Sequence, residues 1–181
     1  MDMSPGTWDP ALFEPVDFEV IESVDGVDGI LFPSVPFHGV ETNAFAWIGL
    51  PDQYEMNTPG MVLVHGGGGN AVHEWVKKWN ERGYAAISMD MNGRGRDAEK
   101  LPNGGPDLGH PEIFATDLAW TDMWTYHSIA AVIRSHSILR SQIGLDAKIG
   151  VTGISWGGYT TCIAAGVDDR YACAIPVYGC G

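Results

Sequence analysis

Short apolar runs that alternate with helical stretches constrain the fold of this chain most strongly. Four such runs follow Pro59, and they lack the strict alternation of polar and apolar residues that marks a half-buried strand: 61–65, 84–90, 148–154 and 171–179. Runs of this kind are typical of strands buried on both faces. Strands alternating with helices predict the α/β class, with a mostly parallel sheet and helices on both faces.

The first part of the chain has a different pattern. Two Asp-Gly pairs, at 25–26 and 28–29, interrupt β-like runs, and such pairs favour the tight turns of antiparallel hairpins. We therefore expect one domain over 1–181, with an antiparallel β region over 1–58 and a parallel α/β core over 59–181. Within that core, a helix is predicted over 117–137, after a Gly- and Pro-rich loop at 92–111.

The stretch GISWGGY contains the pattern G-x-S-x-G, filled by Gly153, Ser155 and Gly157. It stands between a predicted strand and a predicted helix, which is the sharp turn that presents a nucleophilic serine. The amino terminus of the following helix directs backbone N–H groups to the place where negative charge develops. The sequence thus predicts Ser155 as a nucleophile.

A second glycine-rich segment, VHGGGGN at 64–70, ends the first of the four apolar runs. Its bare backbone can donate N–H groups to an oxyanion. Phosphate or nucleotide binding is the competing interpretation. However, the Gly-Lys-Ser/Thr ending of a phosphate-binding loop is missing, and Ala71 stands where the last glycine of G-x-G-x-x-G belongs.

Together, HGGGGN, MDMNGRGRD and GISWGGY, each after a predicted strand, resemble the α/β-hydrolase superfamily. The chain is most similar to its acetyl-xylan-esterase, dienelactone-hydrolase and prolyl-oligopeptidase-like branches. The resemblance implies Ser155 as the nucleophile and an oxyanion hole formed by the backbone N–H groups of Trp156 and Gly67, assisted by Gly66 or Gly68. It implies no metal and no cofactor.

The same resemblance assigns supporting roles to residues beside the expected cleft. His65 precedes the glycine loop and is expected to orient it. Asp90 and Arg94 follow the next predicted strand and are expected to support the cleft structurally. A helix is also predicted after the glycine loop, with Val72, Trp75, Val76 and Trp79 on one face. His73, beside Glu74 on this helix, is expected to face solvent.

The general base of such an enzyme is missing from its usual place. The superfamily order is Ser, then Asp or Glu, then His, yet no histidine follows Ser155 in the chain. Asp168 and Asp169 fall between a helix and a strand, at the amino-terminal end of the sheet, whereas sites lie at the carboxyl end. His110, in the loop after the 84–90 strand, is the candidate surrogate base. We therefore expect the amino-terminal portion of an α/β-hydrolase, truncated after about the sixth strand.

The predicted function is hydrolysis of carboxylic esters, with small molecules or carbohydrates as substrates, through an acyl-enzyme on Ser155. The alternatives are a prolyl-oligopeptidase-like peptidase and a non-catalytic binding protein of the same fold. We expect the 181-residue chain alone to be nearly inactive, because the Asp and His of the triad are missing. We also expect its last strand to leave an apolar edge capable of self-association.

Charge and composition restrict the partners. The formal net charge of −13 argues against nucleic acid and anionic membranes. The first residues show no signal-peptide pattern, and nothing approaches the apolar run that a membrane span needs. These features, with three cysteines that we expect to be reduced, favour a cytoplasmic location.

Overall fold

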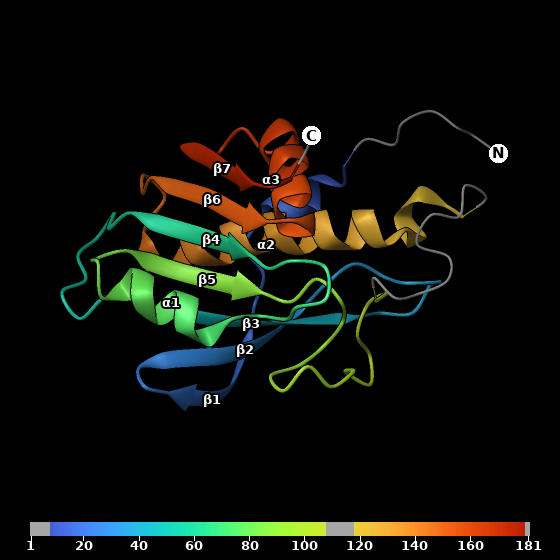
Figure 1. Cartoon of the computed structure of the whole chain (residues 1–181), viewed down its shortest axis with the longest axis horizontal. Helices are drawn as coiled ribbons and strands as arrows, with labels where there is room; N and C mark the ends of the chain where they lie inside the picture. The colour runs from blue at the N-terminus through green and yellow to red at the C-terminus, as the bar shows by residue number, and fades with distance from the viewer. Residues whose placement is uncertain (1–7, 108–117, 180–181) are drawn as a thin grey trace.

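The computed structural model describes residues 8–107 and 118–179, which form one mixed sheet with helices packed on it (Figure 1). Seven strands occur in the described part, in the order β1-β2-β3-β5-β4-β6-β7. Their bounds are β1 Glu19–Val24, β2 Val27–Pro33, β3 Asn43–Gly49, β4 Gly60–Val64, β5 Ala85–Met89, β6 Ile149–Ile154 and β7 Cys173–Val177. The four predicted core strands are thus present.

The pairing changes from antiparallel to parallel at β5. Strands β1, β2 and β3 pair antiparallel, and β3 also runs antiparallel to β5. Strands β5, β4, β6 and β7 pair parallel to one another. In this register Val64, the last residue of β4, is paired with both Met89 and Gly153. The segments that follow these three strands therefore begin at the same edge of the sheet, which brings the motifs of the sequence together.

Helices cover both faces of the sheet, as predicted. Helix α1 (His73–Asn80) lies in front of the sheet in Figure 1, and α2 (Trp124–Ile143) passes behind it. Helix α3 (Trp156–Val167) packs beside α2. Alternate residues of β4 point to opposite sides: Leu63 joins the cluster under α1, whereas Val64 joins the cluster under α2. Burial on both faces explains why the core strands are continuously apolar.

The predicted bounds of the long helix, 117–137, are wrong at both ends. Residues Trp120–Asp122 form a short 3-10 turn, and α2 begins only at Trp124. The helix then continues to Ile143 and ends at Gly144, whose φ of 112° no other residue adopts easily. The extra turns form because Ile138, Leu139 and Ile143 are fully buried against the sheet. Tertiary packing, which sequence periodicity does not show, thus extends the helix at its carboxyl end.

Strand β7 forms one edge of the sheet among the described residues. All of its residues are exposed, in contrast to the fully buried β4. Apolar side chains on and beside it are accessible, among them Ile175 and Val177. Self-association through this edge stays a prediction. Within the described residues, no helix has the length and apolar character needed to cross a membrane.

Candidate active site

Ser155 occupies a strained turn between β6 and α3. Its backbone adopts φ 58° and ψ −121°, a conformation that residues other than glycine rarely take. Ser155 is also the N-cap residue of α3. Strain of this kind costs about 1–3 kcal/mol and persists where the surrounding structure enforces it. Here Ser155 N–H donates to the Val177 carbonyl at 2.8 Å, and its carbonyl accepts from Tyr159 at 3.0 Å. The turn leaves Ser155 exposed at the carboxyl edge of the sheet.

The two glycines that flank Ser155 are required by close contacts. A Cβ on Gly157 would lie 2.9 Å from the carbonyl carbon of Val64, at the end of β4. A Cβ on Gly153 would lie 2.8 Å from Oγ1 of Thr161, one turn into α3. Real Cβ atoms essentially never come closer than 3.0 Å to such neighbours. The pattern G-x-S-x-G therefore lets α3 start directly against β4 and β6.

The glycine-rich loop at 66–69 lies against Ser155. A Cβ on Gly66 would lie 3.8 Å from Cβ of Ser155 and 3.5 Å from the Ile154 carbonyl. The loop closes on itself, because Gly69 N–H donates to the Gly66 carbonyl at 3.0 Å. The parallel register thus brings together the serine and the glycine loop that the sequence singled out separately.

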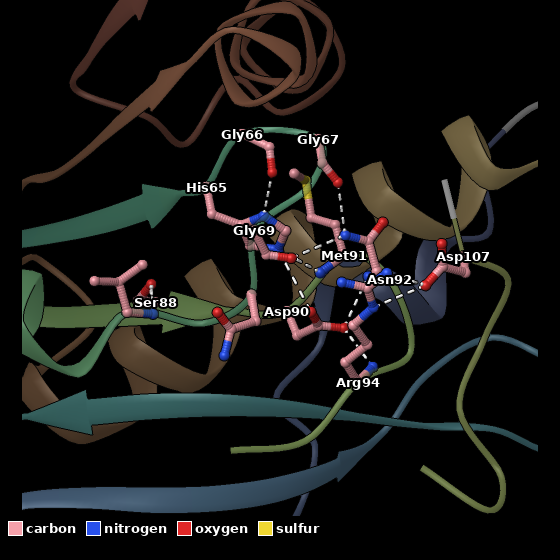
Figure 2. A network of polar contacts seen from close by, with 12 residues as sticks. His65, Gly66, Gly67, Gly69, Ser88, Asp90, Met91, Asn92, Arg94 and Asp107 are labelled. Atoms are coloured by element: carbon pink, nitrogen blue, oxygen red, sulfur yellow. Dashed lines mark hydrogen bonds and ion pairs between the residues drawn. The ribbon is translucent and has the colours of Figure 1, made fainter. Parts of the chain in front are cut away.

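His65 and Asp90 are buried beneath this loop (Figure 2). The Met91 N–H donates to Nε2 of His65 at 3.0 Å, so the proton of the neutral ring resides on Nδ1. Nδ1 then donates to the Gly66 carbonyl at 2.6 Å. Asp90 Oδ1 lies 3.5 Å from Nε2 of His65. With both ring nitrogens occupied by backbone groups, His65 is held in one orientation under the loop.

The sequence analysis missed a third buried residue of this region, Asn92. Its side chain contacts the carbonyls of Gly67 and Gly69 and the indole of Trp124. The available signal was its place in MDMNGRGRD, directly after a predicted strand; its burial, which requires partners for the amide, is visible only in the structure. Nearby, Arg94 forms an ion pair with Asp107 at 2.7 Å, which connects the start of the long loop to a residue further along it.

A cavity of about 450 Å³ opens beside Ser155. It is lined by Thr125, Ser155, Trp156, Tyr159, Tyr178 and Gly179. The ring of Trp156 meets those of Trp124 and Tyr159 edge to face, each at 5.5 Å between centroids. Half of the lining residues are thus aromatic. Neither a histidine nor a carboxylate is among the described residues of this lining.

The structure does not bring any described histidine to the Ser155 hydroxyl, which has no hydrogen-bond partner within residues 8–107 and 118–179. His110, the candidate surrogate base, lies outside the described residues. His73 does not face solvent as expected, because its ring packs on Trp47 and its Nε2 contacts the Val24 carbonyl at 3.1 Å.

The two histidines of α2 are buried away from the cavity lining. Burial lowers the pKa of His127 to about 4. Burial, and next the charge of Arg170, lower the pKa of His136 to about 4 as well. Both rings are therefore neutral near pH 7. Asp168 is paired with Arg170 after the carboxyl end of α3, at the end of the sheet where β6 and β7 begin, whereas Ser155 follows the end of β6.

Comparison with known proteins identifies the family. A family model for acetyl xylan esterases (AXE1) matches residues 10–180. The chain belongs to the acetyl xylan esterase family. None of the curated protein sequences matches it.

Solved structures of this family share the fold. The acetyl xylan esterase from Paenibacillus sp. R4 is 23% identical, with a TM-score of 0.61. Acetyl xylan esterase 1 from Thermoanaerobacterium sp. JW/SL YS485 is 16% identical, also with a TM-score of 0.61. Each match covers 86% of this chain and 50% of the esterase. The chain thus spans about half the length of these family members.

The likeness extends to other α/β-hydrolases. A protein from Klebsiella pneumoniae subsp. pneumoniae MGH 78578, assigned as a dienelactone hydrolase, is 18% identical with a TM-score of 0.54. That match covers 83% of this chain and 60% of the other. At such identities the structures establish the α/β-hydrolase fold, and the acetyl xylan esterase model establishes the family.

Proposed function

We propose that this chain supplies the nucleophile and the oxyanion hole of a serine esterase that acts on short acyl esters of small molecules or carbohydrates. The observation that carries the proposal is the backbone of Ser155, strained at φ 58° and ψ −121°, at the start of α3 and beside a cavity. Strain that exposes a hydroxyl at a helix amino terminus is characteristic of an acyl-transfer nucleophile. Membership of an esterase family supports the same chemistry.

The contacts of the glycine loop support an oxyanion hole that includes Gly67. In a trans peptide the carbonyl of one residue and the N–H of the next point in opposite directions. The Gly66 carbonyl is held by His65 and Gly69, so the N–H of Gly67 is directed away from the buried ring. Among the described residues this N–H has no acceptor. We infer that this N–H and the backbone N–H of Trp156, the first residue of α3, are directed at the developing negative charge.

The proton acceptor of the reaction lies, in this proposal, outside the described residues. A serine hydroxyl needs a base to become nucleophilic near neutral pH, and none of the described cavity-lining residues is a histidine. The two sources are His110 and sequence beyond the 181 residues. We expect the second, because the matched family members are about twice as long as the matched region.

The decisive experiment measures hydrolysis of p-nitrophenyl acetate and labelling by a fluorophosphonate in the full-length protein. Ser155→Ala is expected to abolish labelling and to lower kcat by about 10⁴-fold or more, as loss of a triad nucleophile does. Ser141→Ala, which alters an exposed part of α2, is the matched control and keeps both activities. Equal hydrolysis by the Ser155→Ala protein contradicts the proposal.

The source of the base is tested with the same assay. The 181-residue chain by itself is expected to hydrolyse the ester at least about 10³-fold more slowly than the full-length protein, because an oxyanion hole without a base retains little catalysis. If the two have comparable turnover, His110→Ala identifies or excludes the surrogate base. A peptidase remains the second candidate, and a prolyl peptide substrate cleaved faster than the ester favours it.

A further inference from the structure

Asn92 stands at the centre of the buried polar network beneath the glycine loop (Figure 2). Its side chain is fully buried. The amide nitrogen donates to the Gly67 carbonyl at 2.9 Å and to the Gly69 carbonyl at 3.1 Å. The amide oxygen accepts from the indole N–H of Trp124 at 3.1 Å. Only this orientation of the amide matches its donors and acceptor to these partners.

The backbone of Asn92 is itself fixed by the turn that follows β5. Oδ2 of Asp90 accepts the N–H of Asn92 at 2.8 Å and the N–H of Arg94 at 2.7 Å. Nζ of Lys100 donates to the Asn92 carbonyl at 3.2 Å. The backbone of Asn92 is therefore restrained in the turn after β5, from which its side chain reaches the glycine loop.

These contacts connect Asn92 to both halves of the proposed oxyanion hole. By holding the Gly67 carbonyl, the amide fixes the peptide that follows Gly67, while His65 holds the Gly66 carbonyl of the peptide before it. The N–H of Gly67 therefore lies between two restrained peptides. By accepting from Trp124, it also fixes the ring that packs edge to face on Trp156, with an interplanar angle of 82°. Trp156 carries the other proposed donor. One side chain thus sets the relative position of two segments that lie far apart in the sequence.

We propose that Asn92 is a positioning residue of the oxyanion hole, acting through the Gly67 peptide on one side and through Trp124 on the other. This inference rests on the proposed serine esterase function. Catalysis is sensitive to such placement: a displacement of about 1 Å can cost roughly 10²-fold in rate, and losing one oxyanion donor costs about 10²–10³-fold in kcat.

The test is the isosteric variant Asn92→Asp in the full-length protein, with steady-state hydrolysis of p-nitrophenyl acetate. A carboxylate cannot donate to the Gly67 and Gly69 carbonyls and repels them. We expect kcat to fall about 10–100-fold while KM changes by less than about 3-fold, because the loop acts on the transition state. As the pH is lowered, the ratio of variant to wild-type kcat rises, since a protonated carboxyl regains one donor.

Asn80→Asp is the matched control. Asn80, at the end of α1, also donates its amide to two backbone carbonyls, those of Gly49 and Tyr84, both at 2.9 Å. These contacts lie at the opposite end of the sheet, where β5 begins. We expect this variant to lose stability while kcat stays within about 2-fold of the wild-type value, because its contacts do not involve the glycine loop or Ser155. An equal fall of kcat in both variants overturns the positioning role.

Trp124→Phe is the second, milder variant. It removes the indole donor but keeps an aromatic ring against Trp156, and we expect kcat to fall about 3–10-fold. If Asn92→Asp does not fold, an unchanged kcat in Trp124→Phe overturns the inference. A folded Asn92→Asp protein with wild-type kcat overturns it as well. Failure of the proposed function is distinct, because the wild-type protein then neither hydrolyses the ester nor labels at Ser155.

Discussion

Two buried regions of this molecule each contain a histidine, and the two rings are equally buried but differ in their hydrogen bonding. His65, beneath the glycine loop, and His136, on the inner side of α2, are each 1% exposed. Both ring nitrogens of His65 are hydrogen-bonded to backbone groups. Neither nitrogen of His136 has a partner of good geometry among the described residues, although the backbone of Arg170 lies near enough to raise its pKa slightly.

The difference shows what burial of a polar group does in each place. Around His65 the partners are loop backbone, so the hydrogen bonds fix the shape of the cleft. His136 instead packs its ring edge to face on Tyr171, at 4.7 Å between centroids. The ring of His136 therefore packs like an apolar ring, but burial of its two nitrogens without hydrogen bonds to the described residues costs free energy of folding. The hydrogen bonds of His65 thus hold the backbone of the glycine loop in place. The unpaired ring of His136 instead makes the stability of the fold sensitive to low pH.

The largest loss of stability is expected from a substitution on α3 that crowds the region around His65 and leaves its polar groups unchanged. Gly157→Ala would drive a methyl group into the backbone of Val64. We expect a loss of about 3 kcal/mol or more in the free energy of unfolding and little fluorophosphonate labelling of Ser155. Gly166→Ala, on the same helix with open space around it, should instead be stabilising by about 0.5–1 kcal/mol. Equal stability of the two variants in urea would mean that the close contact is absent.

His65→Phe tests the comparison directly. It removes both hydrogen bonds and leaves the Met91 N–H without its partner. Buried groups left unpaired cost about 1–3 kcal/mol each, so we expect a loss of about 2–4 kcal/mol at pH 7.5. His136→Phe at the same pH should change stability by less than about 1 kcal/mol, because no hydrogen bond is lost. Urea unfolding of both proteins provides the measurement, and similar losses would remove the distinction between the regions.

The smallest effect is a pH dependence that His136 imposes. Its pKa is about 4 in the folded protein and about 6.5 when unfolded. The unfolded state therefore binds the proton first as the pH falls. Stability is complete above about pH 6.5 and is lost progressively down to about pH 4. We expect a loss of about 2 kcal/mol between pH 7 and pH 5 that His136→Phe removes. Identical pH profiles of wild type and variant would show that burial does not lower the pKa of His136 in the folded protein.

Much of the fold could be predicted because its strands are short, local and buried on both faces. The four core strands were found from their apolar runs, and the antiparallel start from the turn at Asp25-Gly26. The second predicted turn, at Asp28-Gly29, is wrong, because both residues lie inside β2 and pair with β3. The bounds of α2 could not be found, because Ile138, Leu139 and Ile143 extend the helix by packing against the sheet. Nor could the environment of His73, which depends on Trp47 from a distant strand.

By itself the sequence determined the elements of the candidate site: a serine between a strand and a helix, and a glycine loop after another strand. Each follows from local rules of backbone sterics and hydrophobic periodicity. Tertiary structure alone decided that Val64 pairs with both Met89 and Gly153, which brings the glycine loop to Ser155 and places Asn92 beneath it. Tertiary structure alone also decided that the ring of His65 is hydrogen-bonded and that, within the described part of the chain, the ring of His136 is not. The partners that a buried ring finds depend on how neighbouring strands are aligned, which packing of the whole sheet determines.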